Sequence, residues 1–357
     1  MNKHLYLDIH AIQTVPPSCV NRDDTGSPKT AVYGGTERAR VSSQSWKRAM
    51  RVYFKEIFAP EELGSRTKQL PRMLAGQIME LQPELDEETA AKLAMEKLKL
   101  VGISVDEKKN LNSALFFISP KQLRAMAELA VKGEKDKKAY AAALKENPAF
   151  DILLFGRMVA DDPDLNYDAA SQVAHAISTH GVHTEYDYFT AVDDEKKEDE
   201  TGAGHLGTVE YNSATLYRYA TVNVGELAAS LGADTAKVIR GFAESFIRSM
   251  PTGKQNTFAN RTLPNMVYVT LREDQPVNFS GAFENAVKSE KDGYAARSCK
   301  ALLEYTDKMY ASFADVPLLA LGCGNGALEG HAEILPLKSM LCRLEEYTAE
   351  RCGKVEK

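Results

Sequence analysis

The sequence lacks the cysteine patterns that indicate disulfide bonds or structural zinc. Its five cysteines are widely spaced and include no Cys-x-x-Cys pair. An odd number of widely spaced cysteines without such a pair argues against both a disulfide framework and a zinc site. His175, His180 and His183 lie close in sequence, but Gly181 separates the last two and no cysteine or carboxylate stands at ligand spacing. We therefore expect structural or surface histidines, no metal, no cofactor, and a reducing cytoplasmic location.

Long apolar runs are also missing. Nowhere do as many as about eighteen apolar residues follow one another, the length that a membrane-spanning helix needs. The N-terminal residues carry a charge inside a short apolar run and no small-residue cleavage site. We expect a soluble protein with no targeting segment and no membrane partner.

No complete nucleotide-binding or hydrolase motif is present. PTGKQN resembles the end of a phosphate-binding loop, but Arg248 replaces its first glycine and Gln255 replaces its Ser or Thr. GCGNG at 322–326 lacks the Rossmann spacing and is expected to be a loop. Lys254 and Gln255 stay candidates for a phosphate contact, with a plain turn as the alternative.

Acidic residues are absent from one stretch of an otherwise acidic chain. Residues 38–55, RARVSSQSWKRAMRVYFK, hold six cations and no acid. Because the whole chain has a net charge of −6, the other residues sum to −12. A polyanion is therefore expected to bind a local groove and not the surface at large.

Residues from 44 onward predict an amphipathic helix. At 100° per residue its apolar side carries Trp46, Met50, Tyr53 and Ile57, and the opposite sector is cationic. That sector holds Gln44, Lys47, Arg48, Arg51 and Lys55. Ser42 or Ser43 can serve as N-cap, and no Glu or Gln closes a capping box, so first-turn N–H groups are open to an anion. Serine hydroxyls, N–H groups and cations together indicate a phosphate-binding face; a solvated surface helix is the alternative.

Periodicity gives a coarse map of the chain. Strands are predicted at 5–13, 216–224 and 266–271, and helices at 167–180, after Asp234, and at 279–288. Residues 14–37 read as a long irregular loop, and residues from about 60 to 158 are rich in helix formers. The segment 189–211 is acidic and then glycine-rich, which favours an exposed hairpin or arm. Without the insertion and the arm, the order is that of an α+β, ferredoxin-like or RNA-recognition-motif sheet.

One acidic pair allows a catalytic hypothesis. Asp23 and Asp24 are adjacent in the loop that precedes the basic helix. Two carboxylates beside a phosphate-binding face can hold Mg²⁺ for phosphodiester cleavage. The structural alternative is an Asx-turn together with Asn21.

Several segments resemble the CasC family, the backbone subunits of the type I-E CRISPR surveillance complex Cascade. They are PSCVNRDDTGSPKTAVYGGTERARVSSQSWKRAMR, GRM at 156–158, VAHAISTHGVHTEYDYFTAVDD, GAGHLGTVEYNSATLYRYATVNV and GKQNTFA. The resemblance runs from residue 1 to about 290 and is weaker in the tail. It implies a palm like an RNA-recognition motif (1–59, 166–192, 212–357), a helical fingers insertion (60–165) and a protruding, hairpin-like thumb (193–211).

The resemblance also implies a function. Family members are non-catalytic and polymerise along the CRISPR RNA, gripping its backbone without sequence preference, while each thumb displaces one nucleotide at a regular interval. Implied partners are the CRISPR RNA, target DNA through the guide, further copies of the chain and other Cascade subunits. The RNA contacts expected from the resemblance and from the basic helix together are Arg22, Lys29, Ser42, Ser43, Gln44, Lys47, Arg48, Arg51, Arg157, Met158, His205, Leu206, Thr208, Lys254 and Gln255.

Two other functions stay open at this point. One is a metal-dependent ribonuclease subunit of a related CRISPR effector that uses Asp23 and Asp24. The other is a monomeric RNA-binding regulator.

Overall fold

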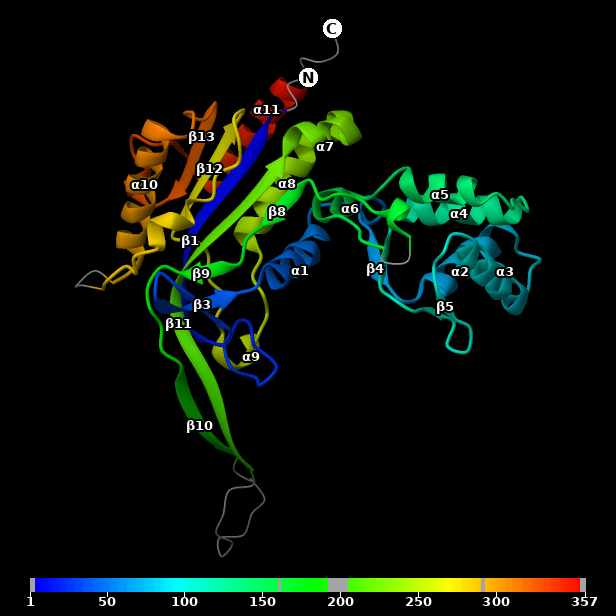
Figure 1. The fold of residues 1–357 in the computed structure, drawn as a ribbon, viewed down its shortest axis with the longest axis horizontal. Coiled ribbons are helices and arrows are strands. Elements are labelled where there is room, and N and C mark those ends of the chain that lie inside the picture. Colours follow the sequence, from blue (N-terminus) through cyan, green and yellow to red (C-terminus); the bar gives the residue numbers. More distant parts are fainter. Residues whose placement is uncertain (1–3, 160–161, 192–204, 290–292, 354–357) are drawn as a thin grey trace, which may run out of the picture. The chain divides into compact units, whose positions relative to one another are not determined.

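A computed structural model describes residues 4–159, 162–191, 205–289 and 293–353 (Figure 1). The chain forms two compact units, one of residues 1–53 and 173–357 and one of residues 54–172. We describe each unit by itself.

The first unit is built on one large, mainly antiparallel sheet. Its strands follow the order β14-β13-β12-β1-β11-β9-β3-β2 among the described residues. The long strand β1 (Tyr6–Ser18) lies between β11 (His205–Asn223) and β12 (Met266–Arg272), antiparallel to both. The remaining strands on this path are β2 (Thr30–Tyr33), β3 (Thr36–Val41), β9 (Ala176–Ser178), β13 (Leu319–Gly324) and β14 (Glu333–Ile334).

Helices cover both faces of this sheet, so β1 is buried on both sides. One face packs Ile12, Tyr217 and Tyr268 against Cys299 and Leu302 of a C-terminal helix. Successive side chains of β1 point to opposite faces and meet different helical layers, so most of both sets are buried. The helices of this unit are α1 (Ser43–Phe54), α7 (Val224–Leu231), α8 (Thr235–Arg248), α9 (Gln255–Phe258), α10 (Ala295–Ser312) and α11 (Leu337–Gly353).

The predicted helix at 167–180 is wrong. This segment contains strands β8 (Ser171–Val173) and β9 instead. In β9, Ile177 pairs with both Tyr217 of β11 and Arg40 of β3. The helical spacing of its apolar residues is overridden because the segment completes the sheet between two strands.

Other local predictions needed smaller corrections. The glycine-rich segment 322–326 is partly strand, since β13 runs to Gly324. A Cβ on Gly322 would lie 2.8 Å from Leu328 Cδ1, so the glycine lets the following 3₁₀ turn pack on the strand. The helix predicted at 279–288 is a short 3₁₀ helix, Phe279–Phe283. Helix α8 was predicted correctly, although Asp234 makes no side-chain capping bond.

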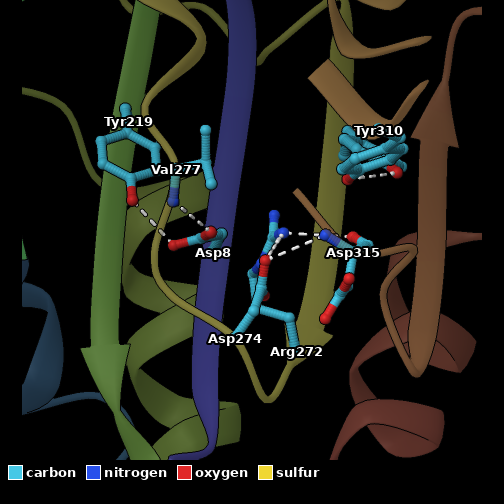
Figure 2. Close-up of polar contacts among 8 residues, drawn as sticks. Asp8, Tyr219, Arg272, Asp274, Val277, Tyr310 and Asp315 are labelled. Carbon is cyan, nitrogen blue, oxygen red and sulfur yellow. Dashed lines mark hydrogen bonds and ion pairs between the residues drawn. The ribbon is translucent and has the colours of Figure 1, made fainter. Parts of the chain in front are cut away.

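A polar group is buried inside the sheet of the first unit. Asp8 of β1 accepts hydrogen bonds from the Tyr219 hydroxyl at 2.7 Å and the Val277 N–H at 3.0 Å (Figure 2). Arg272 donates to both carboxylate oxygens of Asp274 at 2.6 Å. Burial raises the pKa of Asp8 from 3.8 to about 6. These bonds satisfy carboxylates that would otherwise be costly to bury.

The second unit is helical, as its composition predicts. Its core is formed by Leu74, Ile78, Leu98, Met126 and Tyr140, all buried. Its helices are α2 (Leu70–Leu81), α3 (Glu87–Leu100), α4 (Pro120–Val131), α5 (Lys137–Lys145) and α6 (Phe150–Phe155). Short strands pair as β4 (Ser65–Thr67) with β7 (Phe116–Ile118) and β5 (Val105–Asp106) with β6 (Leu111–Asn112).

Candidate nucleic-acid interface

Helix α1 is amphipathic, as predicted. Trp46, Met50 and Phe54 are fully buried on its inner side. Gln44 and Arg48 are exposed on the other side, and Lys47, Arg51 and Ser43 are half-buried. Burial lowers the pKa of Lys47. The helix ends at Phe54, so Lys55 lies just beyond it and extends the same run of positive charge.

Ser42 is the N-cap of this helix. Its Oγ accepts a hydrogen bond from the Ser45 N–H at 3.4 Å, and its own N–H donates to Asn21 Oδ1 at 2.8 Å. Ser42 is buried. Its hydroxyl therefore shapes the start of α1, and the expectation that it faces RNA is not supported by its position.

The loop before β2 folds back on itself around Asp23. A single carboxylate oxygen, Oδ1, accepts the Thr25 N–H at 2.9 Å, the Thr25 hydroxyl at 2.7 Å and the Ser27 N–H at 3.0 Å. The Thr25 hydroxyl holds the pKa of Asp23 below its ordinary value. The turn-forming interpretation of Asp23 is thereby confirmed, but its partners are Thr25 and Ser27, while the Asn21 side chain accepts a hydrogen bond from the Ser42 N–H.

Arg22 and Lys254, which are both predicted to contact RNA and are far apart in sequence, lie near Cys19. Burial raises the pKa of the Cys19 thiol, and the charges of Arg22 and Lys254 both oppose that shift. The 250–260 loop can come this close because a Cβ on Gly253 would lie only 2.1 Å from the Val20 carbonyl oxygen. The structure therefore brings Lys254 and the adjacent Gln255 beside the loop that carries Arg22.

A third group of cations lies around β3, the strand next to the edge strand β2. A terminal guanidinium nitrogen of Arg40, on β3, lies 3.3 Å from His175 Nδ1. Burial lowers the pKa of His175, and the charges of Arg40 and Lys29 lower it further. His175 is therefore neutral at pH 7 and accepts the Arg40 hydrogen bond, which leaves the positive charge on Lys29 and Arg40. Arg40 belongs to the acid-free stretch 38–55 but was not among the RNA contacts predicted from the sequence.

Strands β10 (Glu185–Ala191) and β11 form a hairpin that extends from the sheet (Figure 1). The predicted thumb residues Leu206 and Thr208 are exposed on it, while residues 192–204 and the side chain of His205 lie outside the described part. Tyr186 pairs with Glu210 and Tyr188 with Thr208, so both tyrosines share one face.

Tyr186 and Tyr188 are candidate site residues that were not predicted from the sequence. Their side chains are 67% and 65% exposed and stand two residues apart on one strand, about 7 Å from each other. Exposed aromatic rings at such spacing are typical of surfaces on which nucleobases stack. The sequence indicates this pair only through the segment EYDY at 185–188, whose alternation places both tyrosines on one face of a strand.

In the second unit, Arg157 does not have the expected role. Its buried guanidinium donates to the carbonyl oxygens of Leu165 at 2.9 Å, Phe117 at 3.1 Å and Leu144 at 2.8 Å. Arg157 therefore holds segments of this unit together and is not a free RNA ligand. The neighbouring Met158 is 83% exposed, as a residue that wedges against a nucleotide needs to be.

The described residues contain no group of three or more His, Cys, Asp or Glu side chains arranged to hold a metal ion. Within the same ranges, no helix is both long and apolar enough to cross a membrane. The first unit presents cations on α1 and around β3, and exposed aromatic rings on the β10–β11 hairpin.

The structure is that of a mixed α+β protein with a large, mainly antiparallel sheet, a cationic helix face on α1 and an exposed pair of tyrosines on β10. The chain belongs to the family of CT1975-like proteins, whose model matches residues 7–338. No curated protein matches it.

Solved structures extend this relationship. A chain of a structure titled "CRISPR RNA-guided surveillance complex, pre-nicking" is 33% identical, with a TM-score of 0.79 over 97% of this chain and 99% of that one. A second, from a "CRISPR RNA-guided surveillance complex", is 30% identical, with a TM-score of 0.62 over the same shares. The resemblance to subunits of a CRISPR surveillance complex is thereby confirmed.

Proposed function

We propose that this protein is a non-catalytic backbone subunit of a CRISPR RNA-guided surveillance complex. Copies of it polymerise along the guide RNA, hold the phosphate backbone, and present the bases for pairing with target DNA. The observation that carries this proposal is the acid-free cationic face of α1, supported on the first unit's sheet, in a chain of which 97% matches subunits of such complexes.

Backbone contacts suit a guide whose sequence varies. Contacts between the proposed side chains and phosphates supply affinity without sequence information. Base pairing then provides specificity, as in other RNA-guided systems. These side chains are Arg22, Lys29, Ser43, Gln44, Lys47, Arg48, Arg51, Lys254 and Gln255.

The β10–β11 hairpin is proposed as the thumb. Its exposed face combines the Tyr186 and Tyr188 rings with Leu206, which is 56% exposed. Aromatic and apolar side chains insert between bases without needing to recognise them. The sheet of the first unit is proposed as an RNA-recognition-like palm and the helical unit as fingers.

The proposal is tested by expressing the chain with its partner subunits and a CRISPR array. We expect a large, RNA-rich particle with several copies of this chain, measured by light scattering and the absorbance ratio. A small RNA-bound monomer in place of that particle supports the regulator hypothesis. Recovery of the chain without RNA overturns the proposed function.

A further inference from the structure

A hollow beside β1 is not explained by the contacts described so far. It is open to solvent on one side, has a volume of about 20 Å³, which is room for one water-sized group, and is walled by apolar side chains of β1, β3 and β11. Its polar lining includes Lys29, Arg40, Asn21 and Asn212, and no carboxylate. A site that offers N–H donors and cations without an acid selects a ligand that accepts hydrogen bonds or carries negative charge.

The hollow lies where the sheet is interrupted. The pairing of β1 with β11 shifts register between Val15 and Ser18, on either side of Pro16 and Pro17. Proline has no N–H to donate, so the ladder breaks at this point. Pairing resumes at Ser18 and Asn212, which places Asn212 at the far edge of the break.

Asn212 carries an unused donor at this position. Its side chain is only 8% exposed, and its Nδ2 has neither a hydrogen-bond partner nor contact with solvent. An unsatisfied buried donor of this kind is unfavourable and calls for an explanation. Rotation about χ2 of asparagine is broad and roughly two-fold, so the amide can turn its donor into the hollow without backbone movement.

Cations stand in the same lining. Arg40 uses Nε to donate to the Thr30 carbonyl oxygen at 3.1 Å and a terminal nitrogen to contact His175. A guanidinium has five N–H donors, so these two bonds leave donors for an anion. Asn21 is already engaged, because its side-chain oxygen accepts from Ser42 and its carbonyl from Lys29.

We propose that the hollow receives the 2′-hydroxyl of one ribose of the guide RNA, with the sugar ring at its mouth. The 2′-hydroxyl accepts a hydrogen bond from Asn212, the apolar wall contacts the sugar, and the adjoining phosphate binds Lys29 and Arg40. A neutral amide suits a neutral hydroxyl, while the cations suit the charged group next to it. The 2′-hydroxyl is the group that separates RNA from DNA. This inference rests on the proposed function and adds that Asn212 makes the protein prefer RNA.

The test compares short single-stranded RNA with DNA of the same sequence, by fluorescence anisotropy on the full-length protein. Wild type should bind the RNA more tightly, and Asn212→Leu should reduce that preference by roughly fivefold to tenfold, the worth of about one hydrogen bond. Its affinity for DNA should change less than about twofold. As a matched control, Arg48→Gln should weaken RNA and DNA binding alike.

A second measurement needs no variant. RNA with 2′-O-methyl groups should bind wild type no better than DNA, because the methyl group occupies the space next to Asn212. RNA binding with an unchanged RNA-to-DNA ratio in Asn212→Leu, or full affinity for methylated RNA, overturns the inference and leaves the proposed function standing. Failure of wild type to bind any RNA overturns the proposed function instead.

Discussion

The guanidinium of Arg218 lies over the indole ring of Trp46, with its central carbon 3.6 Å from the ring centroid. Arg218 is on β11 and Trp46 on the inner side of α1. The same guanidinium donates to Gln13 Oε1 at 2.6 Å and to the carbonyl oxygen of Phe246. Burial lowers the pKa of Arg218 to about 9, so it stays mostly charged at pH 7. One buried cation thus joins the cationic helix to β1, β11 and α8.

Trp46→Leu should lower the stability of the protein without changing the salt dependence of RNA binding. Losing the ring leaves a cavity and an unstacked Arg218, which should cost about 2–4 kcal/mol in the free energy of unfolding. RNA affinity should fall because α1 loses its support, while the salt dependence of binding stays unchanged because every cation is retained. Urea denaturation and a salt titration measure the two effects. A lower salt slope in this variant would show that Trp46 is not merely a support.

Arg48→Glu should weaken RNA binding for every spacer sequence alike. We choose Arg48 because it is exposed, whereas Lys47 and Arg51 are half-buried. Removing one phosphate contact should lower the log–log salt slope by about 0.7 for a single strand. Lys308→Glu, an exposed charge reversal on α10, is the matched control and should leave affinity nearly unchanged. Spacer-dependent loss in the Arg48 variant argues against backbone binding.

Tyr188→Ala should disturb the displaced nucleotides. Loss of one stacking ring is worth about 1–3 kcal/mol per base. Chemical probing of RNA in assembled complexes should show hyper-reactive nucleotides at a constant spacing in wild type and weaker ones in the variant. Thr190→Ala changes the same exposed strand without removing a ring, so it should keep the pattern. Equal patterns in all three proteins exclude the hairpin as the thumb.

Two substitutions at Asp23 should distinguish turn formation from catalysis. Asp23→Asn keeps an oxygen for the Thr25 and Ser27 donors, so RNA binding should be close to wild type. Asp23→Ala loses all three bonds and should destabilise the folded conformation of the loop, with weaker RNA binding than wild type. Neither should alter RNA cleavage by assembled complexes in Mg²⁺, assayed on gels with the Asp24→Ala control. Mg²⁺-dependent cleavage that disappears in both Asp23 variants supports the ribonuclease hypothesis.

Asp8 should make the stability of the protein depend on pH in an unusual direction. Its pKa rises from 3.8 to about 6 on folding, so the folded state binds more protons between these values. The carboxyl therefore contributes stability at low pH that is lost as pH rises toward 6, up to about 3 kcal/mol. His10, whose pKa burial lowers from 6.5 to about 3, acts oppositely, because its contribution is lost on acidification.

Asp8→Asn separates the contribution of Asp8 to the pH dependence of stability from that of His10. Wild type should gain stability relative to Asp8→Asn as pH falls from 7 to 4, because only the carboxyl can take up a proton. The variant should lose stability on acidification more steeply than wild type, since the effect of His10 is no longer opposed. Urea denaturation across this range measures both curves. Parallel curves would falsify the assignment of the buried titration to Asp8.

Much of the candidate site could be predicted from local sequence. The acid-free stretch and its helical period placed Trp46 and Met50 inside and Gln44 and Arg48 outside, because these patterns depend on neighbours only three or four residues away. The helical composition of the second unit and the positions of α8 and β12 followed from the same local signals. The Asp23 turn was recognisable because its partners are within four residues.

Tertiary structure decided what depends on distant segments. Residues 171–178 became strands because β11 and β3 offered open edges, which no local propensity records. The side chain of Arg157 is not available to a ligand because it donates hydrogen bonds to carbonyl groups of three separate segments. The close approach of Gly253 to Val20 places Lys254 beside Arg22. The break in the pairing of β1 with β11 places Asn212 in the lining of the hollow. Local periodicity determines which face of a helix is cationic, but only the packing of the chain determines which side chains remain available to RNA.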